Sequence, residues 1–145
     1  MPARTKARKR ALDVLFEADL RAADPLEILA DHTARADTPV PEYAVRLVEG
    51  VAAHRAEIDR IIEQFAVGWT LQRMPTVDRN ILRLAIYELL WVTEVPDAVV
   101  LAEAVKLAQD LSTAESAPFV NGVLAAVRAN QATVTASPPP GEPPD

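Results

Sequence analysis

The amino-acid sequence predicts an all-α protein. Apolar residues recur at helical spacing through most of the chain, and no segment shows the alternation of a half-buried strand. The segment 76–91 is almost entirely apolar, since after Arg83 its only charged residue is Glu88. A helix of this composition must be covered on nearly every side, as the central helix of a bundle is.

The N-terminal part of the chain is expected to form two helices. The first is predicted over residues 3–23, where apolar side chains recur along one face. Asp24 and Pro25 predict the start of a short second helix, because Asp is a favoured N-cap and Pro fits the first helical position. This helix fades near Ala36, and residues 38–41, Thr-Pro-Val-Pro, then break the chain.

A third helical segment is predicted over residues 42–65. Gly50 and the polar residues at 54–55 predict a kink or short break within it, because Gly and local polarity weaken a helix. Residues 68–75 follow as a connector that ends in proline. The connector is expected to have two buried anchors, Trp69 and Leu71.

Three further helices are predicted in the rest of the chain. Thr76 is expected to cap the central helix, and Asp78 lies in its first turn, where the helix dipole favours a carboxylate. Residues 96–97, Pro-Asp, predict the start of the fifth helix. Residues 112–115 fit a capping box for the sixth, although the proline that follows favours a start at Ser116.

The proline breaks divide the chain so that about three helical pieces lie on either side. A chain of 145 residues is most simply one domain, and we assign this domain to residues 1–130. Residues 131–145 are predicted to be a disordered proline-rich tail, because five of the last eight residues are proline.

Composition excludes several classes of protein. The chain contains no cysteine, which excludes disulfides and thiolate metal sites. No apolar run approaches the length of a membrane span, and no signal peptide is recognised at the N-terminus. We therefore expect a soluble cytoplasmic protein that does not contact a membrane.

Charge is distributed very unevenly along the chain. The formal net charge is −6, which by itself argues against a nucleic-acid-binding protein. The first ten residues, however, contain five basic side chains and no acidic one, and subtracting these five charges from −6 leaves −11 on the remainder. An acidic body repels phosphate, so any RNA that binds must do so at the basic end. The basic residues there are Arg4, Lys6, Arg8, Lys9 and Arg10.

No pattern in the sequence indicates an enzyme. His32 and His54 lie in separate segments among Asp and Arg residues, and there is no Gly-rich phosphate loop or metal-ligand spacing. Asp59 and Glu63 are spaced i, i+4, but such pairs usually line a solvated helix face. We therefore expect neither catalysis nor a cofactor.

Several motifs together resemble the NusB family of bacterial transcription antitermination factors, over roughly residues 4–128. Residues 7–16 fit the arginine-rich first helix of that family. The other motifs are Val-Asp-Arg-Asn-Ile-Leu-Arg-Leu-Ala-Ile-Tyr-Glu-Leu at 77–89, Val-Pro at 95–96, Glu-Ala-Val-Lys-Leu-Ala at 103–108 and Phe-Val-Asn-Gly-Val-Leu at 119–124. The resemblance implies two three-helix sub-bundles packed as one domain.

The resemblance also implies a function. Members of the family bind the boxA element of nascent single-stranded RNA together with NusE, a ribosomal protein that doubles as a Nus factor. The complex then joins the elongating RNA polymerase with other Nus factors and suppresses termination on ribosomal RNA operons. Some relatives form homodimers, so the oligomeric state stays open.

The same resemblance implies roles for individual residues. Phe16 and Phe119 are implied to meet RNA bases, because bases of single-stranded RNA stack on aromatic side chains. Glu115 is implied near the same surface, where it tunes affinity or accepts a hydrogen bond from a base. Asn121 is a further candidate for RNA contact. The structural alternatives are a core role for Phe16 and close helix packing at Gly122.

The start of the central helix is the last candidate. The resemblance places Asp78, Arg79 and Arg83 at the junction of RNA and the partner protein, with both arginines toward RNA and Asp78 toward the partner. The structural alternative is an ordinary capped and charged first turn.

Two rival interpretations remain open from the sequence. One is a non-catalytic helical adaptor that binds only proteins, in which the basic end merely solvates the terminus. The other is the NusB-like domain that precedes the catalytic domain in some rRNA cytosine methyltransferases, which would be inactive by itself.

Overall fold

The computed structural model describes residues 2–35 and 39–135, and within them it contains helices and no strand. The predicted all-α class is confirmed. The α-helices are α1 (Ala3–Arg21), α2 (Pro25–Arg35), α3 (Glu42–Ala53), α4 (Arg55–Phe65), α5 (Thr76–Trp91), α6 (Asp97–Leu111), α7 (Ser116–Ala129) and α8 (Gln131–Thr135), with a 3-10 turn, η1 (Leu71–Arg73), before α5. None of these helices is long and apolar enough to cross a membrane.

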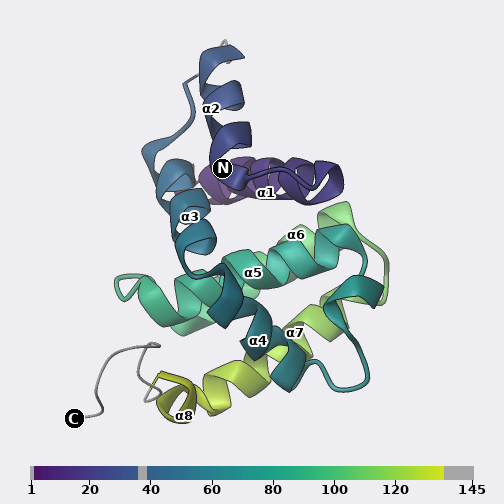
Figure 1. The fold of residues 1–145 in the computed structure, drawn as a ribbon. Helices are drawn as coiled ribbons and strands as arrows, with labels where there is room; N and C mark the ends of the chain where they lie inside the picture. The colour runs from purple at the N-terminus through teal and green to yellow at the C-terminus, as the bar shows by residue number, and fades with distance from the viewer. Residues whose placement is uncertain (1, 36–38, 136–145) are drawn as a thin grey trace, which may run out of the picture.

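The helices form two groups around α5 (Figure 1). Helices α1, α2 and α3 pack on one another, and α6 and α7 pack on each other and on α5. The segment predicted over 42–65, with a kink or short break inside it, is divided at His54, and its second half, α4, packs on α5 and α7. The second group therefore includes α4 as well as α5, α6 and α7.

Helix α5 is the central helix that its composition predicts. Every residue from Asn80 to Leu89 is buried, and α5 contacts α1, α3, α4, α6 and α7. Its polar residues in this stretch, Asn80, Arg83 and Glu88, all have hydrogen-bond partners. Helix α5 therefore positions the helices that carry the candidate site residues.

Of the two features that predicted a break in the third segment, the polar residues at 54–55 mark it and Gly50 does not. It lies inside α3, and the break is at His54. A Cβ atom at Gly50 would lie only 2.0 Å from Cζ of Tyr87 on α5. Glycine is therefore needed here for the close crossing of α3 and α5, and not for a change of backbone direction.

Two of the predicted helix caps are wrong. Pro75, and not Thr76, is the N-cap of α5, and no side chain caps that helix. Helix α7 begins at Ser116, the predicted alternative start, so residues 112–115 do not form a capping box. Asp78 lies in the first turn of α5 as expected.

The connector and the C-terminal segment also differ from expectation. Leu71 is buried as predicted, but Trp69 is 48% exposed and is not a core anchor. Residues 131–135, which the sequence assigned to the tail, form the short helix α8, with Val134 buried. The rest of the predicted tail, residues 136–145, lies outside the described residues.

Candidate nucleic-acid interface

The first turns of α1 present the basic side chains that the sequence singled out. Lys6 and Lys9 are exposed, and Arg10 is half-buried. Lys9 lies 3.6 Å from Asp13, one turn further on, with both side chains about half exposed. Lys6 and Arg10 form no ion pair with any described residue. Three positive charges on this helix are thus accessible from solvent.

Arg4 is accessible to solvent but also contacts an acidic and an aromatic side chain of the protein. Its side chain is 45% exposed and lies 3.8 Å from Glu94, and its guanidinium stacks 4.6 Å above the ring of Tyr43. Glu94 is held mainly by Arg46, at 2.6 Å, and this hydrogen bond lowers the pKa of Glu94 to about 2. A phosphate that binds Arg4 must therefore compete with an ionised carboxylate.

Arg8 is buried, with 4% of its side chain exposed. Its guanidinium donates two hydrogen bonds to Glu88 on α5, at 2.7 and 2.9 Å, and one to Glu103 on α6, at 3.2 Å. The hydroxyl of Tyr43 donates a further hydrogen bond to Glu88 at 2.7 Å. Burial alone would lower the pKa of Arg8, but the hydrogen bonds and charge of Glu88 and the charge of Glu103 raise it above its ordinary value. The phosphate role of Arg8 stays a prediction, and in this structure the two carboxylates already occupy its donors.

A signal for this burial is present in the sequence. Arg8 lies three residues before Ala11, four before Leu12 and seven before Leu15, which places it on the apolar face of α1. A basic residue in such a position either pairs with a carboxylate from a neighbouring helix or, if it is left unpaired, destabilises the folded protein.

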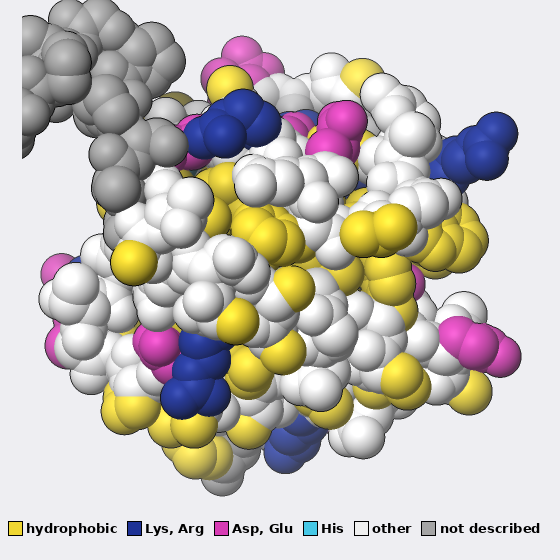
Figure 2. Space-filling model, turned by 90° about the horizontal axis from the view of Figure 1, so that it is seen from below, with side chains coloured by type: hydrophobic (Ala, Val, Ile, Leu, Met, Phe, Trp, Pro, Cys, Tyr) yellow, Lys and Arg dark blue, Asp and Glu magenta, His cyan; other side chains and the backbone are white. Residues whose placement is uncertain are grey.

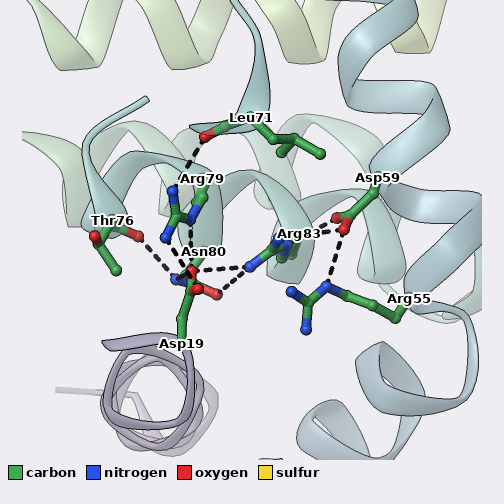
Figure 3. Close-up of polar contacts among 8 residues, drawn as sticks. All are labelled: Asp19, Arg55, Asp59, Leu71, Thr76, Arg79, Asn80 and Arg83. Atoms are coloured by element: carbon green, nitrogen blue, oxygen red, sulfur yellow. Dashed lines mark hydrogen bonds and ion pairs between the residues drawn. The ribbon is translucent and has the colours of Figure 1, made fainter. Parts of the chain in front are cut away.

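Arg79 and Arg83 belong to a second ionic cluster, between α1, α4 and α5 (Figure 3). Asp19 on α1 accepts hydrogen bonds from Arg79 at 2.6 and 2.9 Å, from Asn80 at 2.8 Å and from Arg83 at 3.0 Å. Arg83 also donates to Asp59 on α4, at 2.8 and 3.2 Å. Burial raises the pKa of Asp19, but the hydrogen bonds of Arg79 and Asn80 and the charge of Arg83 outweigh it and lower that pKa to about 2.

This second cluster fastens the C-terminal half of α1 to the centre of the molecule. Arg83 is 4% exposed and Arg79 is 18% exposed. Both donate to carboxylates, and Arg79 also donates to the backbone carbonyl of Leu71. Their contact with RNA stays a prediction. Their position shows directly that they hold helices together.

Asp78 is buried and joins α5 to the start of α7. Its carboxylate accepts hydrogen bonds from the hydroxyl of Ser112 at 2.5 Å and from that of Ser116 at 2.8 Å. Only 3% of the residue is exposed, so the partner contact predicted for it would require this small polar cluster to open.

Phe16 lies on the exposed side of α1. It is half-buried and outside the hydrophobic core. It follows Lys9 by seven residues and therefore shares its face of the helix. Leu20, one turn further along, is 66% exposed. The solvent face of α1 thus changes from basic at its start to apolar at its end.

Phe119 belongs to a second candidate site. It lines a pocket of about 430 Å³ at the start of α7. Its ring meets Trp69 edge-on, with the ring centroids 6.1 Å apart. Glu115 is exposed at the same pocket. The lining includes Trp69, Met74, Pro75, Thr113, Glu115 and Phe119. Trp69 is the residue that sequence reasoning missed, because an aromatic residue in a short connector was interpreted as a core anchor.

Asn121 and Gly122 are both exposed on α7. No atom lies within 4 Å of a Cβ built on Gly122, so the predicted close approach of two helices at this glycine is wrong. Val120 and Leu124, the apolar neighbours, are fully buried.

The opposite side of the molecule has a different surface. Seen from below, the side on which α4, α7 and α8 lie in Figure 1, lysine and arginine side chains lie apart from one another among apolar and uncharged groups (Figure 2). On this face the basic side chains do not gather as they do at the start of α1.

Comparison with known proteins agrees with this arrangement. A model of the NusB family matches residues 5–129. The transcription antitermination protein NusB of Salinispora tropica is 60% identical over 127 residues, which cover 86% of this chain and 93% of the relative. That of Kineococcus radiotolerans is 53% identical over 136 residues, covering 94% and 100%. A crystal structure of antitermination factors NusB and NusE in complex with dsRNA matches with a TM-score of 0.78 at 32% identity, covering 87% of this chain and 96% of the other. With its central helix and basic first helix, the chain belongs to the NusB family.

Proposed function

We propose that this protein is an RNA-binding transcription antitermination factor. It binds boxA RNA together with NusE, joins the RNA polymerase elongation complex and suppresses termination on ribosomal RNA operons. Support comes from the relatives named transcription antitermination protein NusB and from the similar fold of NusB in a complex with NusE and dsRNA. The observation that carries the proposal is the accessible basic face at the start of α1 in an otherwise acidic chain.

RNA binds along the solvent face of α1. The accessible side chains Arg4, Lys6, Lys9 and Arg10 hold phosphates, and Phe16, further along the helix, stacks on a base. The acidic remainder of the chain repels phosphate, so the RNA is confined to this face. Because these are about four phosphate contacts to single-stranded RNA, the log–log salt slope of the binding constant is about −3.

Arg8 and Arg83 act from inside the protein. Arg8 ties the start of α1 to Glu88 on α5, and Arg83 ties its C-terminal half to the same helix through Asp19. The two ion pairs hold the RNA-binding face of α1 in a fixed orientation. Arg79 supports Asp19 in the same way, at the junction with the partner protein.

The second RNA contact lies at the start of α7. Phe119 offers a partly exposed ring, and the polar side chains of Glu115, the N-cap residue of α7, and of Asn121 are exposed. Asp78 keeps this helix start in place through Ser112 and Ser116, so its effect on partner binding is indirect.

The proposal is tested by titrating fluorescent boxA RNA and a scrambled RNA with the protein, at two salt concentrations, with and without NusE. Preferential binding to boxA that weakens with salt and tightens with NusE is expected. Lys6→Ala and Lys9→Ala should each reduce the salt slope by about 0.7. Arg60→Ala, which removes an exposed charge on α4, is the matched control and should leave binding unchanged.

Arg8→Ala is unsuitable for this test, because it would leave Glu88 buried without its cation. Equal binding of both RNAs, or none, under all conditions would contradict the proposal. Binding to NusE alone would then identify the chain as a helical protein-binding adaptor.

A further inference from the structure

A hollow of about 790 Å³ is lined by the start of α1, by α3 and by the C-terminal half of α5. Arg4 comes from α1 and Tyr87 from α5, and most of the wall is one face of α3. The volume falls within the range of about 300–1,000 Å³ that is typical of small-ligand sites. None of its lining residues lines the pocket at the start of α7, so the hollow is a separate candidate site.

The hydroxyl of Tyr87 is a polar group that the fold leaves without a partner. The residue is only 9% exposed, and its Oη forms no hydrogen bond with a described residue. Among the described residues, no fully enclosed side-chain oxygen lacks a partner. This Oη must therefore meet the open space of the hollow that Tyr87 lines. A tyrosine buried to this extent usually finds a hydrogen-bond partner for its hydroxyl.

Two carboxylates of α3 border the same hollow. Glu42 and Glu49 are both exposed, and neither forms a hydrogen bond or ion pair with a described residue. They are seven residues apart in the sequence, which places them two turns apart on one face of the helix. At a rise of about 1.5 Å per residue, their separation along the helix axis is about 10 Å. The wall therefore carries unpaired negative charge at two separate points.

The two arginines at the hollow already have partners. Arg46 donates two hydrogen bonds to Glu94, at 2.6 and 3.1 Å. Arg4 lies 3.8 Å from the same carboxylate and 4.6 Å above the ring of Tyr43. When the two carboxylates of α3 are included, two positive and three negative charges give a sum of −1. The hollow therefore favours a cation over an anion.

The wall between the two carboxylates is apolar. Val45 and Gly50 lie between them on the lining face of α3, and Ala53 extends this face by one turn. Methylene groups gain free energy when they cover such a surface, whereas a bare metal cation does not. Carboxylates separated by apolar surface therefore match a ligand whose cationic ends are separated by a methylene chain.

We propose that this hollow binds an aliphatic polyamine. Its ammonium groups contact Glu42 and Glu49, and its methylene chain lies along the apolar wall between them. A further N–H group donates to Oη of Tyr87. An ammonium group has only donors, and the acceptors that it needs are the three groups that the described structure leaves unpaired. This site does not depend on the proposed RNA binding.

Trp91 is a reporter for the hollow, because its ring stacks on the lining residue His54 with the ring centroids 4.3 Å apart. In the full-length Trp69→Phe protein Trp91 is the only tryptophan, because the chain contains two. Its emission is followed while spermidine, diaminooctane or diaminopropane is added at constant ionic strength. Isothermal titration calorimetry on the unmodified chain detects binding that leaves the emission unchanged.

Length at constant charge is the decisive comparison. Extended diaminooctane reaches between carboxylates about 10 Å apart, whereas diaminopropane, with the same charge, reaches only one of them. Diaminooctane is therefore expected to bind about 2- to 5-fold more tightly, the factor for one additional exposed ion pair. Spermidine should bind at least as tightly as diaminooctane, because it carries a third amine.

Three variants assign the contacts. Glu42→Gln and Glu49→Gln should each remove the advantage of diaminooctane over diaminopropane, because only one carboxylate remains. Tyr87→Phe should weaken spermidine binding about tenfold and leave urea unfolding unchanged, since the lost hydroxyl has no described partner. Glu63→Gln is the matched control, because Glu63 is an exposed carboxylate on α4 outside the hollow. This variant should bind like the unmodified chain.

Four results would overturn the inference. Absence of both heat and emission change with every amine rejects the site. Equal binding of the two diamines, with Glu42→Gln and Glu63→Gln alike, would show that the acidic chain only gathers counterions. If tetralysine binds and the polyamines do not, the occupant is a basic peptide. If boxA RNA quenches Trp91 and the amines do not, the arginines define the hollow and its ligand is anionic.

Discussion

Asp19→Asn tests whether the ionic cluster between α1 and α5 stabilises the fold. The substitution keeps the shape of the side chain and removes the charge that Arg79 and Arg83 share. The pKa of Asp19 falls from 3.8 to about 2 in the folded protein, and a tenfold change in proton affinity corresponds to about 1.4 kcal/mol. Since the side chain is only 14% exposed, the ionised carboxylate should contribute about 2 kcal/mol to the free energy of unfolding. This is less than the 3–5 kcal/mol typical of breaking a fully buried pair, because Arg83 keeps its bonds to Asp59.

The pH dependence of this contribution follows from its sign. The pKa of Asp19 is depressed by folding, so its contribution is fully present above about pH 4 and is lost as pH falls toward about 2. Urea unfolding followed by circular dichroism, at pH 7 and in steps down to pH 3, measures the difference between the parent protein and Asp19→Asn. That difference should be about 2 kcal/mol at pH 7 and should shrink below pH 4.

Asp13→Asn is the matched control, on the same helix and paired only with the exposed Lys9. It should change the unfolding free energy by less than about 0.5 kcal/mol. A difference for Asp19→Asn below about 0.5 kcal/mol at pH 7, or one that does not vary with pH, would refute the reasoning.

The remaining predictions concern two glycines and the buried arginine of α1. Gly50→Ala should lower the unfolding free energy by about 1–3 kcal/mol in urea, because its Cβ would overlap the ring of Tyr87; an unchanged midpoint would show that α3 and α5 separate freely. Gly122→Ala should instead raise it by about 0.5–1 kcal/mol, since the site is an open position inside a helix, and a loss there would reveal a contact that the structure does not contain. Arg8→Met should cost about 3–5 kcal/mol by leaving Glu88 unpaired, and Glu88→Gln combined with it should recover part of that loss in the same urea assay.

The sequence predicts the helices and the core well because both depend on a local period. The apolar composition of residues 76–91 predicts a helix buried on all sides, and the whole stretch from Asn80 to Leu89 is buried. The break near residues 54–55 is also located correctly. These features depend on neighbours along the chain, and the sequence contains that information directly.

The roles of the charged residues depend on partners that are distant in sequence. Arg8 and Glu88 are 80 residues apart, and Arg83 and Asp19 are 64 apart. Nothing near Arg8 in sequence distinguishes a phosphate ligand from a buried ion pair, apart from its position on the apolar face of α1. The exposure of Trp69 could not be predicted for a similar reason, because it depends on where the start of α7 lies relative to the connector.

The ion pair between Arg8 and Glu88 also determines when the basic face can form during synthesis. A ribosome adds about 5–20 residues per second, so Glu88 follows Arg8 out of the ribosome's catalytic centre after about 4–16 s, given the 80 residues between them. Until then the guanidinium has no carboxylate from α5 to neutralise it, and α1 has no central helix to pack on. The N-terminal helix is therefore synthesised first but packs into place last, and the nascent chain acquires its basic face only when most of its length has been translated.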